Sequence, residues 1–234
     1  MKVFIVHAHP EPKSFNAALT RVAVETFEGG GHDVVVSDLY TMGWDPVSGP
    51  QNFTGRKDPA VYKQQVEEAH AVETNGFSVE VQAEMDKLFA CDALIFQFPM
   101  WWFSMPAVLK GWVDRVFAFQ RVYGGGRWYD HGTMRGKRAM ASVTTGGPAT
   151  MYEETGLAGD MNMLLAPVNQ GVFRYVGFDV LPSFVAWAPA RASEADRAHM
   201  LAAYRERLLA WDTTEPLVYP SLSAYDPSFR LARP

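Results

Sequence analysis

The sequence predicts an α/β protein with a doubly wound, five-stranded parallel sheet in the order 2-1-3-4-5 and helices on both faces. Short apolar segments alternate with longer segments whose apolar residues recur every three or four positions, which is typical of alternating strands and helices. The short segments carry apolar residues at consecutive positions, as strands that are buried on both sides do. Right-handed crossovers between such strands place helices on both faces of the sheet.

Each expected element follows from this pattern. Strands are expected at Lys2–Val6, Val34–Ser37, Ala93–Phe98, Lys137–Val143 and Asp179–Trp187. Helices are expected from Ser14 or Asn16 to about Phe27, at Val79–Phe89, from Pro106 to Phe117, at Met161–Tyr175 and at Ser193–Trp211. Residues 41–75 have no long periodic run, so we expect an excursion over the surface with one short helix near Pro59–Ala71.

Two helix starts carry specific signals. Ser14 or Asn16 can cap the first helix, and three consecutive glycines after Phe27 are a strong stop. Ser193, with Asp196 three positions later, resembles a capping box.

Length and composition indicate one globular domain at 1–212, followed by an extended tail at 213–234 that packs on it. A net charge of −5 argues against sequence-independent binding of nucleic acid, which depends on Lys and Arg neutralising phosphates. The single Cys91 leaves no Cys-rich metal site and fits a reducing compartment. The longest apolar stretch, 93–109, is interrupted by a glutamine and two prolines. We therefore expect a cytoplasmic protein without membrane insertion.

Three loops of unusual composition should meet at one place. Ligands of such sheets bind beyond the carboxyl ends of the strands, where the strand order reverses, which here lies between strands one and three. The loops that end there are His9–Asn16, Pro99–Phe103 and Thr144–Tyr152. The first leads into a helix N-terminus, whose free N–H groups and dipole attract an anion such as a pyrophosphate. A capped helix with no ligand is the alternative interpretation of that loop.

The other two loops favour a flat ligand. Two adjacent tryptophans and a phenylalanine within Pro99–Phe103 are costly to expose, so they either wall a planar ligand or form a corner of the core. Paired glycines in Thr144–Tyr152 let the backbone approach a ligand edge and offer N–H groups to it. An apolar wall with amide donors is what an isoalloxazine ring requires. His7 and His9 lack a suitable third ligand, so no metal site is expected.

In these loops and the segments around them, the chain resembles the NAD(P)H:quinone oxidoreductases of the DT-diaphorase type, within the flavodoxin-like superfamily. The segments that carry the resemblance read HAHPEPKSFNAAL, SDLYTMGWDP, FQFPMWWFSMPAVLKGWVDRVF, SVTTGG, GDMN and GFDVL, and they span residues 1 to about 210. The resemblance implies an FAD enzyme, rather than an FMN enzyme, that reduces quinones by a ping-pong transfer of hydride from NAD(P)H in one shared pocket. It also implies a homodimer with active sites at the interface.

The loops and the resemblance together specify the expected site. The cofactor-binding residues are His9, Ser14, Phe15, Asn16, Pro99, Met100, Trp101, Trp102, Phe103, Thr144, Thr145, Gly146, Gly147, Tyr152 and Arg197. The catalytic residues are Tyr152, Gly146 and Gly147, which would steady the reduced flavin. The pocket for the acceptor is lined by Trp102, Phe103, Tyr123, Gly125, Trp128, Met151 and Tyr175.

Several positions depart from the family pattern. Ala158 stands where the mammalian pattern has a histidine, and Gly125 replaces a second pocket tyrosine. Arg174 and Val176 occupy the region of a relative's metal site, which is not reproduced. Two other functions remain open at this point: a flavin-binding ancillary or regulatory subunit of an ion-efflux system, and a reductase that acts mainly on azo or nitro compounds.

Overall fold

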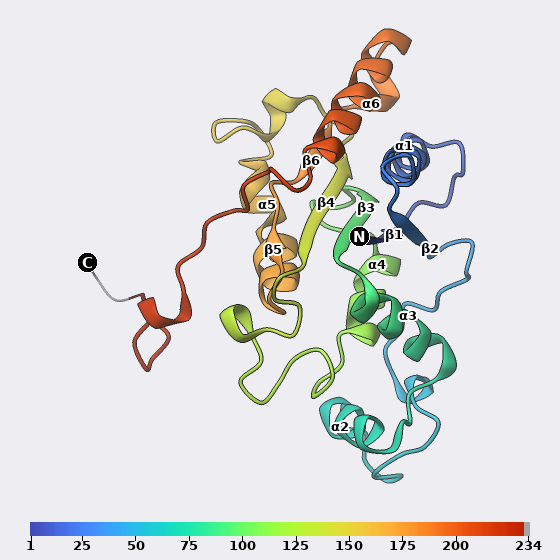
Figure 1. Ribbon diagram of the computed structural model, residues 1–234, viewed down its shortest axis with the longest axis vertical. Helices are drawn as coiled ribbons and strands as arrows, with labels where there is room; N and C mark the ends of the chain where they lie inside the picture. The colour runs from blue at the N-terminus through green and yellow to red at the C-terminus, as the bar shows by residue number, and fades with distance from the viewer. Residues whose placement is uncertain (232–234) are drawn as a thin grey trace.

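A computed structural model describes residues 1–231 and confirms the predicted α/β architecture (Figure 1). The central path of the sheet runs β2-β1-β3-β4-β5, and every pair of strands in it is parallel. The strands are β1 (Lys2–His7), β2 (Asp33–Asp38), β3 (Ala93–Pro99), β4 (Arg138–Thr144), β5 (Asp179–Val180) and β6 (Phe184–Ala186). The order reverses between β1 and β3, as the sequence predicts.

The last strand differs from the prediction of one continuous strand at 179–187. It consists of β5 and β6, which both pair with β4. Val180 pairs with Ala139 and Phe184 pairs with Ser142. The chain therefore advances four residues from Val180 to Phe184 while β4 advances three. The extra residue and Pro182, which has no N–H to donate, interrupt the ladder.

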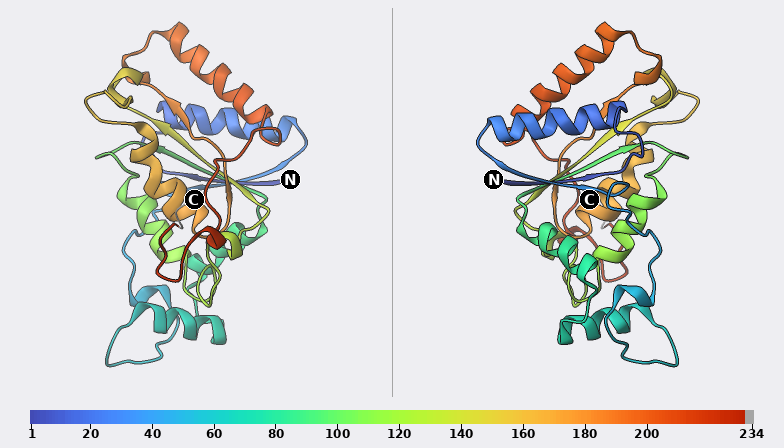
Figure 2. Two further views of the ribbon diagram at one scale, coloured as in Figure 1. Left: turned by 90° about the vertical axis from the view of Figure 1, so that its left-hand side faces the viewer. Right: turned by 90° about the vertical axis from the view of Figure 1, so that its right-hand side faces the viewer.

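The helices form two layers, one on each face of the sheet (Figure 2). One layer holds α1 (Phe15–Gly29) and α6 (Glu194–Leu209). The other layer holds α3 (Val79–Ala90), α4 (Ala107–Val116) and α5 (Met161–Val168). A separate hydrophobic cluster fills the space under each layer. The apolar stripes that predicted the helices are therefore the faces that the helices bury.

The strand β2 is less buried than predicted. Val35 is 45% exposed and Val36 is 38% exposed, although the sequence predicts a strand that is buried on both faces. The reason is its position, because β2 lies at the edge of the sheet and pairs only with β1. A run of consecutive apolar residues does not distinguish an edge strand from a central one.

The excursion at 41–75 contains α2 (Gln64–Thr74), which begins later than the helix predicted at 59–71 (Figure 1). Two buried carboxylates of α2 accept hydrogen bonds from the backbone of neighbouring loops. Glu67 accepts from the N–H groups of Lys57 and Asp58, and Glu68 accepts from the N–H of Phe119. Glu67 thus holds two parts of the excursion together, and Glu68 ties the excursion to the segment that follows α4.

The predicted helix starts are confirmed. The Ser14 hydroxyl accepts a hydrogen bond from the N–H of Ala17, and Ser193 and Asp196 form a complete capping box. The helix predicted at 161–175 is helical throughout, but after Pro167 it widens into a π-helical segment, Asn169–Arg174. Both caps lie at the same edge of the sheet, where β1 and β6 end.

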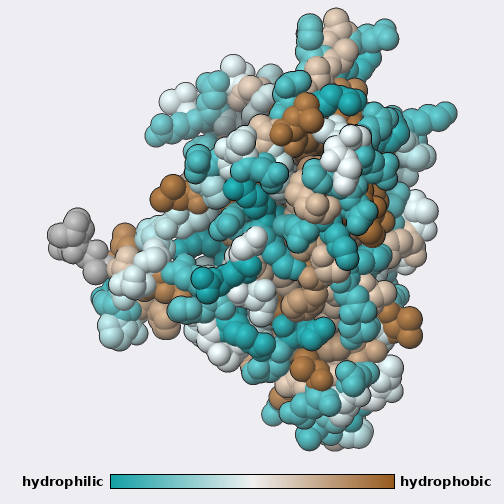
Figure 3. All heavy atoms as spheres, viewed as in Figure 1, coloured by the Kyte–Doolittle hydropathy of each residue, from teal (hydrophilic) through white to brown (hydrophobic). Residues whose placement is uncertain are grey.

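After α6 the chain crosses back over the sheet toward β5 (Figure 1). The N–H of Leu217 donates to the carbonyl of Val180, and Tyr219 packs under the guanidinium of Arg174. The boundary of the domain at residue 212 stays a prediction, and residues 232–234 of the expected tail lie outside the described residues. Within residues 1–231, none of the helices has the length and apolar character to span a membrane. On the face in Figure 3, hydrophobic residues form small patches among hydrophilic ones.

Candidate functional site

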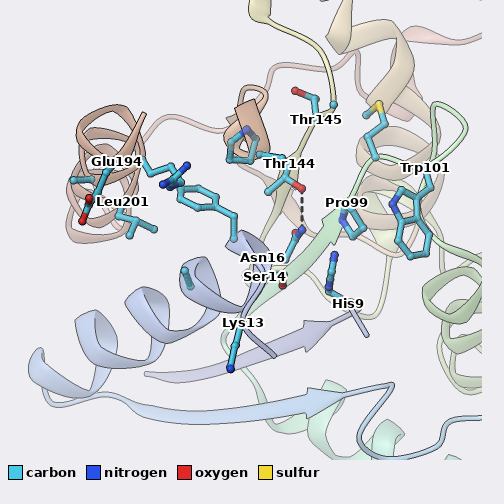
Figure 4. Close-up of a pocket in the computed structure, with 18 residues that line it drawn as sticks. His9, Lys13, Ser14, Asn16, Pro99, Trp101, Thr144, Thr145, Glu194 and Leu201 are labelled. Carbon is cyan, nitrogen blue, oxygen red and sulfur yellow. Dashed lines mark hydrogen bonds between the residues drawn. The ribbon is translucent and has the colours of Figure 1, made fainter. Parts of the chain in front are cut away.

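A cavity of about 800 Å³ lies at the carboxyl ends of β1, β3 and β4, beside the point where the strand order reverses (Figure 4). All three loops singled out in the sequence contribute to it. Of the expected cofactor-binding residues, those that line it are His9, Ser14, Phe15, Asn16, Pro99, Met100, Trp101, Thr144, Thr145, Gly146 and Arg197. Segments almost 190 residues apart in the chain therefore share one cavity, as expected for a ligand site of this fold.

The first loop places free N–H groups at the start of α1, beside the cavity. A tight turn forms because the N–H of Glu11 donates to His9 Nδ1 at 3.0 Å and the N–H of Lys13 donates to the Glu11 carboxylate at 2.8 Å. The N–H groups of the first helical turn, at Phe15 and Asn16, have no acceptor within the helix and lie beside the cavity. Positive helix dipole and free N–H groups together suit a phosphate.

Two cationic side chains and one carboxylate, that of Glu194 in α6, line this end of the cavity. Lys13 from the first loop and Arg197 from α6 both line the cavity. Burial lowers the pKa of His9, and the hydrogen bond and negative charge of Glu11 offset that effect only in part. His9 is therefore neutral near pH 7, and the two cations carry the positive charge of the site.

The second loop presents one tryptophan to the cavity and two aromatic residues to solvent. Trp101 lines the cavity, with its ring centroid 6.1 Å from that of His9. Reciprocal hydrogen bonds between the backbones of Trp101 and Ser104 close a tight turn, which holds Trp102 and Phe103 at φ values of 51° and 59°. Bulky residues rarely adopt this left-handed conformation. Trp102 is 96% exposed, and neither it nor Phe103 lines the cavity.

The third loop divides its roles among four residues. Thr144, Thr145 and Gly146 line the cavity, whereas Gly147 does not. The Thr145 hydroxyl donates to the carbonyl of Gly147 at 2.8 Å, so it shapes the loop from within. A Cβ on Gly146 would meet nothing within 4 Å, but one on Gly147 would come 2.5 Å from the sulfur of Met151. The absence of a side chain at Gly146 therefore leaves space for a ligand. The absence of a side chain at Gly147 leaves space for the side chain of Met151.

Tyr152 is buried behind this loop. It ends the short 3₁₀ helix Ala149–Tyr152, and its ring centroid lies 5.5 Å from that of Trp187. The residue is 8% exposed and does not line the cavity of this chain. Met151 packs against the core in the same region. The structure thus brings Tyr152 and Gly147 together, but of Gly146, Gly147 and Tyr152 only Gly146 lies at the cavity surface.

Four residues expected in the acceptor pocket lie elsewhere. Tyr123, Gly125, Trp128 and Tyr175 do not line the cavity. Tyr175 is instead part of an aromatic cluster, 5.7 Å from Tyr123 and 5.3 Å from Tyr129 between ring centroids. It precedes β5, whose Asp179 pairs with Arg138 at the beginning of β4. A strand of seven residues spans about 20 Å, so the start of β5 and Thr144 lie beside opposite ends of β4.

Part of the cavity wall is formed by residues that the sequence did not predict. The residues not anticipated are Lys13, Ala18, Pro189, Ala190, Glu194, Ala198 and Leu201. Most of them lie in the loop that follows β6 or in the first turns of α6. The rule that ligands bind beyond the carboxyl ends of strands also applies to this loop and could have identified it. Within residues 1–231, no three His, Cys, Asp or Glu side chains are grouped to hold a metal ion.

Comparison with known proteins agrees with this geometry. Residues 1–208 match the family described as having a flavodoxin-like fold. The chain belongs to this flavodoxin-like family. A human relative, ribosyldihydronicotinamide dehydrogenase (quinone), is 42% identical over 217 residues, which cover 92% of this chain and 94% of the human protein. The guinea-pig (Cavia porcellus) NAD(P)H dehydrogenase (quinone) 1 is 38% identical, with 98% of this chain and 84% of that protein covered.

Solved structures show the same relationship. A Klebsiella pneumoniae protein assigned as a quinone reductase has a TM-score of 0.95 to this flavodoxin-like chain and is 38% identical, over 99% of this chain and 93% of its own. The general stress protein 14 of Treponema denticola, in complex with FMN, has a TM-score of 0.61 at 22% identity, which shows a shared fold alone. Within the flavodoxin-like family, the chain is thus an oxidoreductase of the NAD(P)H dehydrogenase (quinone) type.

Proposed function

We propose that the protein is an FAD-dependent enzyme that reduces quinones by two electrons, taking hydride from NAD(P)H in a ping-pong cycle. The overall reaction converts NAD(P)H, a proton and a quinone into NAD(P)⁺ and a hydroquinone. The observation that carries this proposal is the single cavity that joins an anion site at the start of α1 to the indole of Trp101 and the Thr144–Gly146 loop. When bound, a flavin accepts hydride from the nicotinamide and passes it to the quinone.

The residues present fit a flavin. Pro99, Met100 and Trp101 provide an apolar wall, and the open space beside Gly146 admits a ring edge close to the backbone. The oxygen of the Thr144 hydroxyl accepts a hydrogen bond from Asn16 Nδ2 at 2.8 Å, which leaves its own proton free to donate (Figure 4). Backbone and hydroxyl donors of this kind stabilise negative charge that develops on a reduced ring.

The extent of the cavity favours FAD over FMN. Glu194 and Leu201 of α6 lie at one end in Figure 4 and Trp101 lies at the other, with Ser14 and Thr144 between them. An isoalloxazine at Trp101 with its phosphate at the start of α1 would leave the α6 end unfilled. An adenosine would fill that end, with Arg197 and Lys13 beside the pyrophosphate.

The two groups of expected acceptor-pocket residues indicate a homodimer. The aromatic cluster of Tyr123, Tyr129 and Tyr175 does not line the cavity that Thr144 lines within one chain. A second copy can supply it, and the exposed Trp102 belongs to the cavity side of such an interface. Leu157 and Met163, which follow β4 at the same edge of the sheet, are also exposed. Each pocket would then combine the flavin site of one protomer with the tyrosines of its partner.

The first experiment is the visible spectrum of the purified protein, followed by chromatographic identification of the released cofactor. We expect flavin absorption bands and FAD after denaturation. Stopped-flow mixing with NADH, NADPH or ribosyldihydronicotinamide, and then with menadione, should show two separate half-reactions. Tyr152→Phe should slow reduction of the flavin. A colourless preparation that takes up neither FAD nor FMN would overturn the proposal, and turnover below about 1 s⁻¹ would favour a regulatory flavoprotein.

The shared pocket has its own test, based on two variants that we expect to be inactive when each is expressed alone. One variant carries Gly146→Leu in the flavin site, and the other carries Tyr123→Ala and Tyr175→Ala in the aromatic cluster. In a mixed dimer, one of the two pockets regains an intact flavin site and an intact cluster. Coexpression should therefore restore activity, whereas pockets built within single chains would stay inactive.

A further inference from the structure

A row of buried polar side chains crosses the sheet beneath the cavity. His7 of β1, Gln97 of β3 and Ser142 of β4 are register partners, and all three are buried on the face that α1 and α6 cover. Such side chains lower stability unless they are hydrogen-bonded. His7 Nδ1 lies 2.8 Å from the Thr20 hydroxyl, but Gln97 Oε1 has no partner within residues 1–231. The row therefore has a cost to stability that an apolar row would avoid.

Gln97 connects this row to the cavity through two directed hydrogen bonds. Gln97 Nε2 donates to Asn16 Oδ1 at 2.9 Å, and Asn16 Nδ2 donates to Thr144 Oγ1 at 2.8 Å. An amide has one donating end and one accepting end, so the first bond decides which end of Asn16 faces Thr144. All three residues are buried, which leaves water little access to these groups.

The direction of this relay determines what Thr144 can offer a ligand. Because the Thr144 oxygen accepts from Asn16, its proton is available to a group in the cavity that Thr144 lines. If the Asn16 amide were turned round, its Oδ1 would take that proton, and the hydroxyl could no longer donate to the cavity. Gln97 itself does not line the cavity, so it can act there only through Asn16.

We propose that Gln97 is a positioning residue of the cofactor site, which holds Asn16 so that the Thr144 hydroxyl donates to the bound flavin. This inference rests on the proposed function, because it takes the cavity to be a flavin site. The bond from Gln97 Nε2 to Asn16 Oδ1 supports it, because this bond turns the accepting end of Asn16 toward Gln97 and its donating end toward Thr144. Gln97 thus keeps the Thr144 hydroxyl free to donate to the cavity, while its own unpartnered Oε1 lowers the stability of the fold.

A double-mutant cycle tests the relay. We would measure the FAD dissociation constant by titrating flavin-free protein, and the free energy of unfolding in urea without flavin. Gln97→Leu and Thr144→Val should each weaken FAD binding about tenfold, as loss of one hydrogen bond predicts. The double variant should be no weaker than the weaker single variant, because both changes remove the same contact. Gln97→Met replaces Gln97→Leu if the leucine variant does not fold.

The control is Ser142→Ala, at the register partner of Gln97, which is equally buried but bonds to neither Asn16 nor Thr144. It should leave FAD affinity within twofold of wild type. Effects of Gln97→Leu and Thr144→Val that multiply in the double variant would overturn the relay while leaving the proposed function intact. An equal loss of FAD affinity in Ser142→Ala would also overturn it. Failure of the wild-type protein to bind any flavin would overturn the proposed function, and this inference with it.

Discussion

The backbone N–H of Met100 donates a hydrogen bond to the carbonyl oxygen of Thr144, with 2.8 Å between the two atoms. This bond extends the β3–β4 ladder by one step beyond the pairing of Pro99 with Thr144. It therefore sets the distance between the aromatic loop and the threonine–glycine loop at the mouth of the cavity. Two loops that are remote in the sequence are positioned by the most rigid part of the fold, the centre of the sheet.

The two glycines of the third loop should respond differently to alanine. Gly146→Ala adds a Cβ that meets no protein atom within 4 Å, so the free energy of unfolding should be unchanged while FAD affinity falls at least tenfold. Gly147→Ala places a Cβ 2.5 Å from the Met151 sulfur, so the free energy of unfolding should fall by about 1–3 kcal/mol. Urea unfolding and FAD titration of both variants check this, and the opposite pattern would contradict the assigned roles.

FAD affinity should rise as the pH falls, and His9 is the reason. Burial lowers the pKa of His9 in the free protein below its ordinary value, so the free imidazole stays neutral at pH 7. A bound pyrophosphate would stabilise the imidazolium and raise this pKa, so binding would take up a proton at pH values between the two pKa values. Affinity should therefore increase as pH falls through the pKa of the bound state and level off below that of the free state.

The matched comparison for this pH effect is His9→Asn, which keeps a polar side chain that does not titrate. In FAD titrations across pH 5 to 8, the dissociation constant of this variant should lack the part of the pH dependence that comes from His9. Lys13, Arg197 and Glu194 also line the site, and His9→Asn leaves all three unchanged. An unchanged slope in His9→Asn would remove His9 from the phosphate site.

Glu68 should have two opposing effects on the free energy of unfolding at neutral pH. Its buried charge should lower this free energy, and its hydrogen bonds should raise it. Burial raises the pKa of Glu68, and the hydrogen bonds from the Phe119 N–H and Gln64 offset this only in part. A carboxyl group with a raised folded-state pKa loses stability as pH rises through that pKa. Glu68→Gln should therefore unfold at higher urea than wild type at pH 7.5, and this difference should shrink as pH falls toward the ordinary pKa of a glutamate.

Glu68→Ala separates the charge from the hydrogen bonds. It leaves the buried N–H of Phe119 without its acceptor, so the free energy of unfolding should fall by about 1–3 kcal/mol at pH 7.5. Urea titrations at several pH values measure both variants. A glutamine variant as unstable as the alanine variant at pH 7.5 would contradict this account.

Arg174 should hold the chain segment after α6 against the aromatic cluster. Its guanidinium lies 5.0 Å from the ring centroid of Tyr129 and 4.6 Å from that of Tyr219, and it donates to the carbonyl of Pro220. Arg174→Met removes these contacts and keeps an apolar side chain. We expect faster proteolysis near Tyr219 and a higher KM for the quinone, with the FAD dissociation constant unchanged.

The control for Arg174 is Arg205→Met, which breaks an exposed ion pair with Glu25. Exposed pairs contribute little, so the free energy of unfolding should change by less than about 1 kcal/mol. Equal proteolysis of the two variants would show that Arg174 does not hold this segment. Weaker FAD binding in Arg174→Met would place its effect in the flavin site instead.

Local patterns by themselves determined most elements of this protein, and the strand order followed from the commonest arrangement of alternating strands and helices. Periodicity of apolar residues and the caps at Ser14 and Ser193 depend on residues within one or two helical turns, so they can be recognised in the sequence. The rule for the carboxyl ends of parallel strands then brings His9, Trp101 and Thr144 together. Arg197 came from the family resemblance, because nothing in its own neighbourhood distinguishes it from other arginines on a helix.

Only the tertiary structure decided the exposure of Val35, the division of the last strand at Pro182, and the position of Tyr175 outside the cavity that Thr144 lines. It also decided that Gln97, in an otherwise apolar strand, meets Asn16 from 81 residues away. The physical reason is the same in each case. Burial, register and hydrogen-bond direction depend on which distant segment packs against a residue, and a linear pattern of residue types does not contain that information.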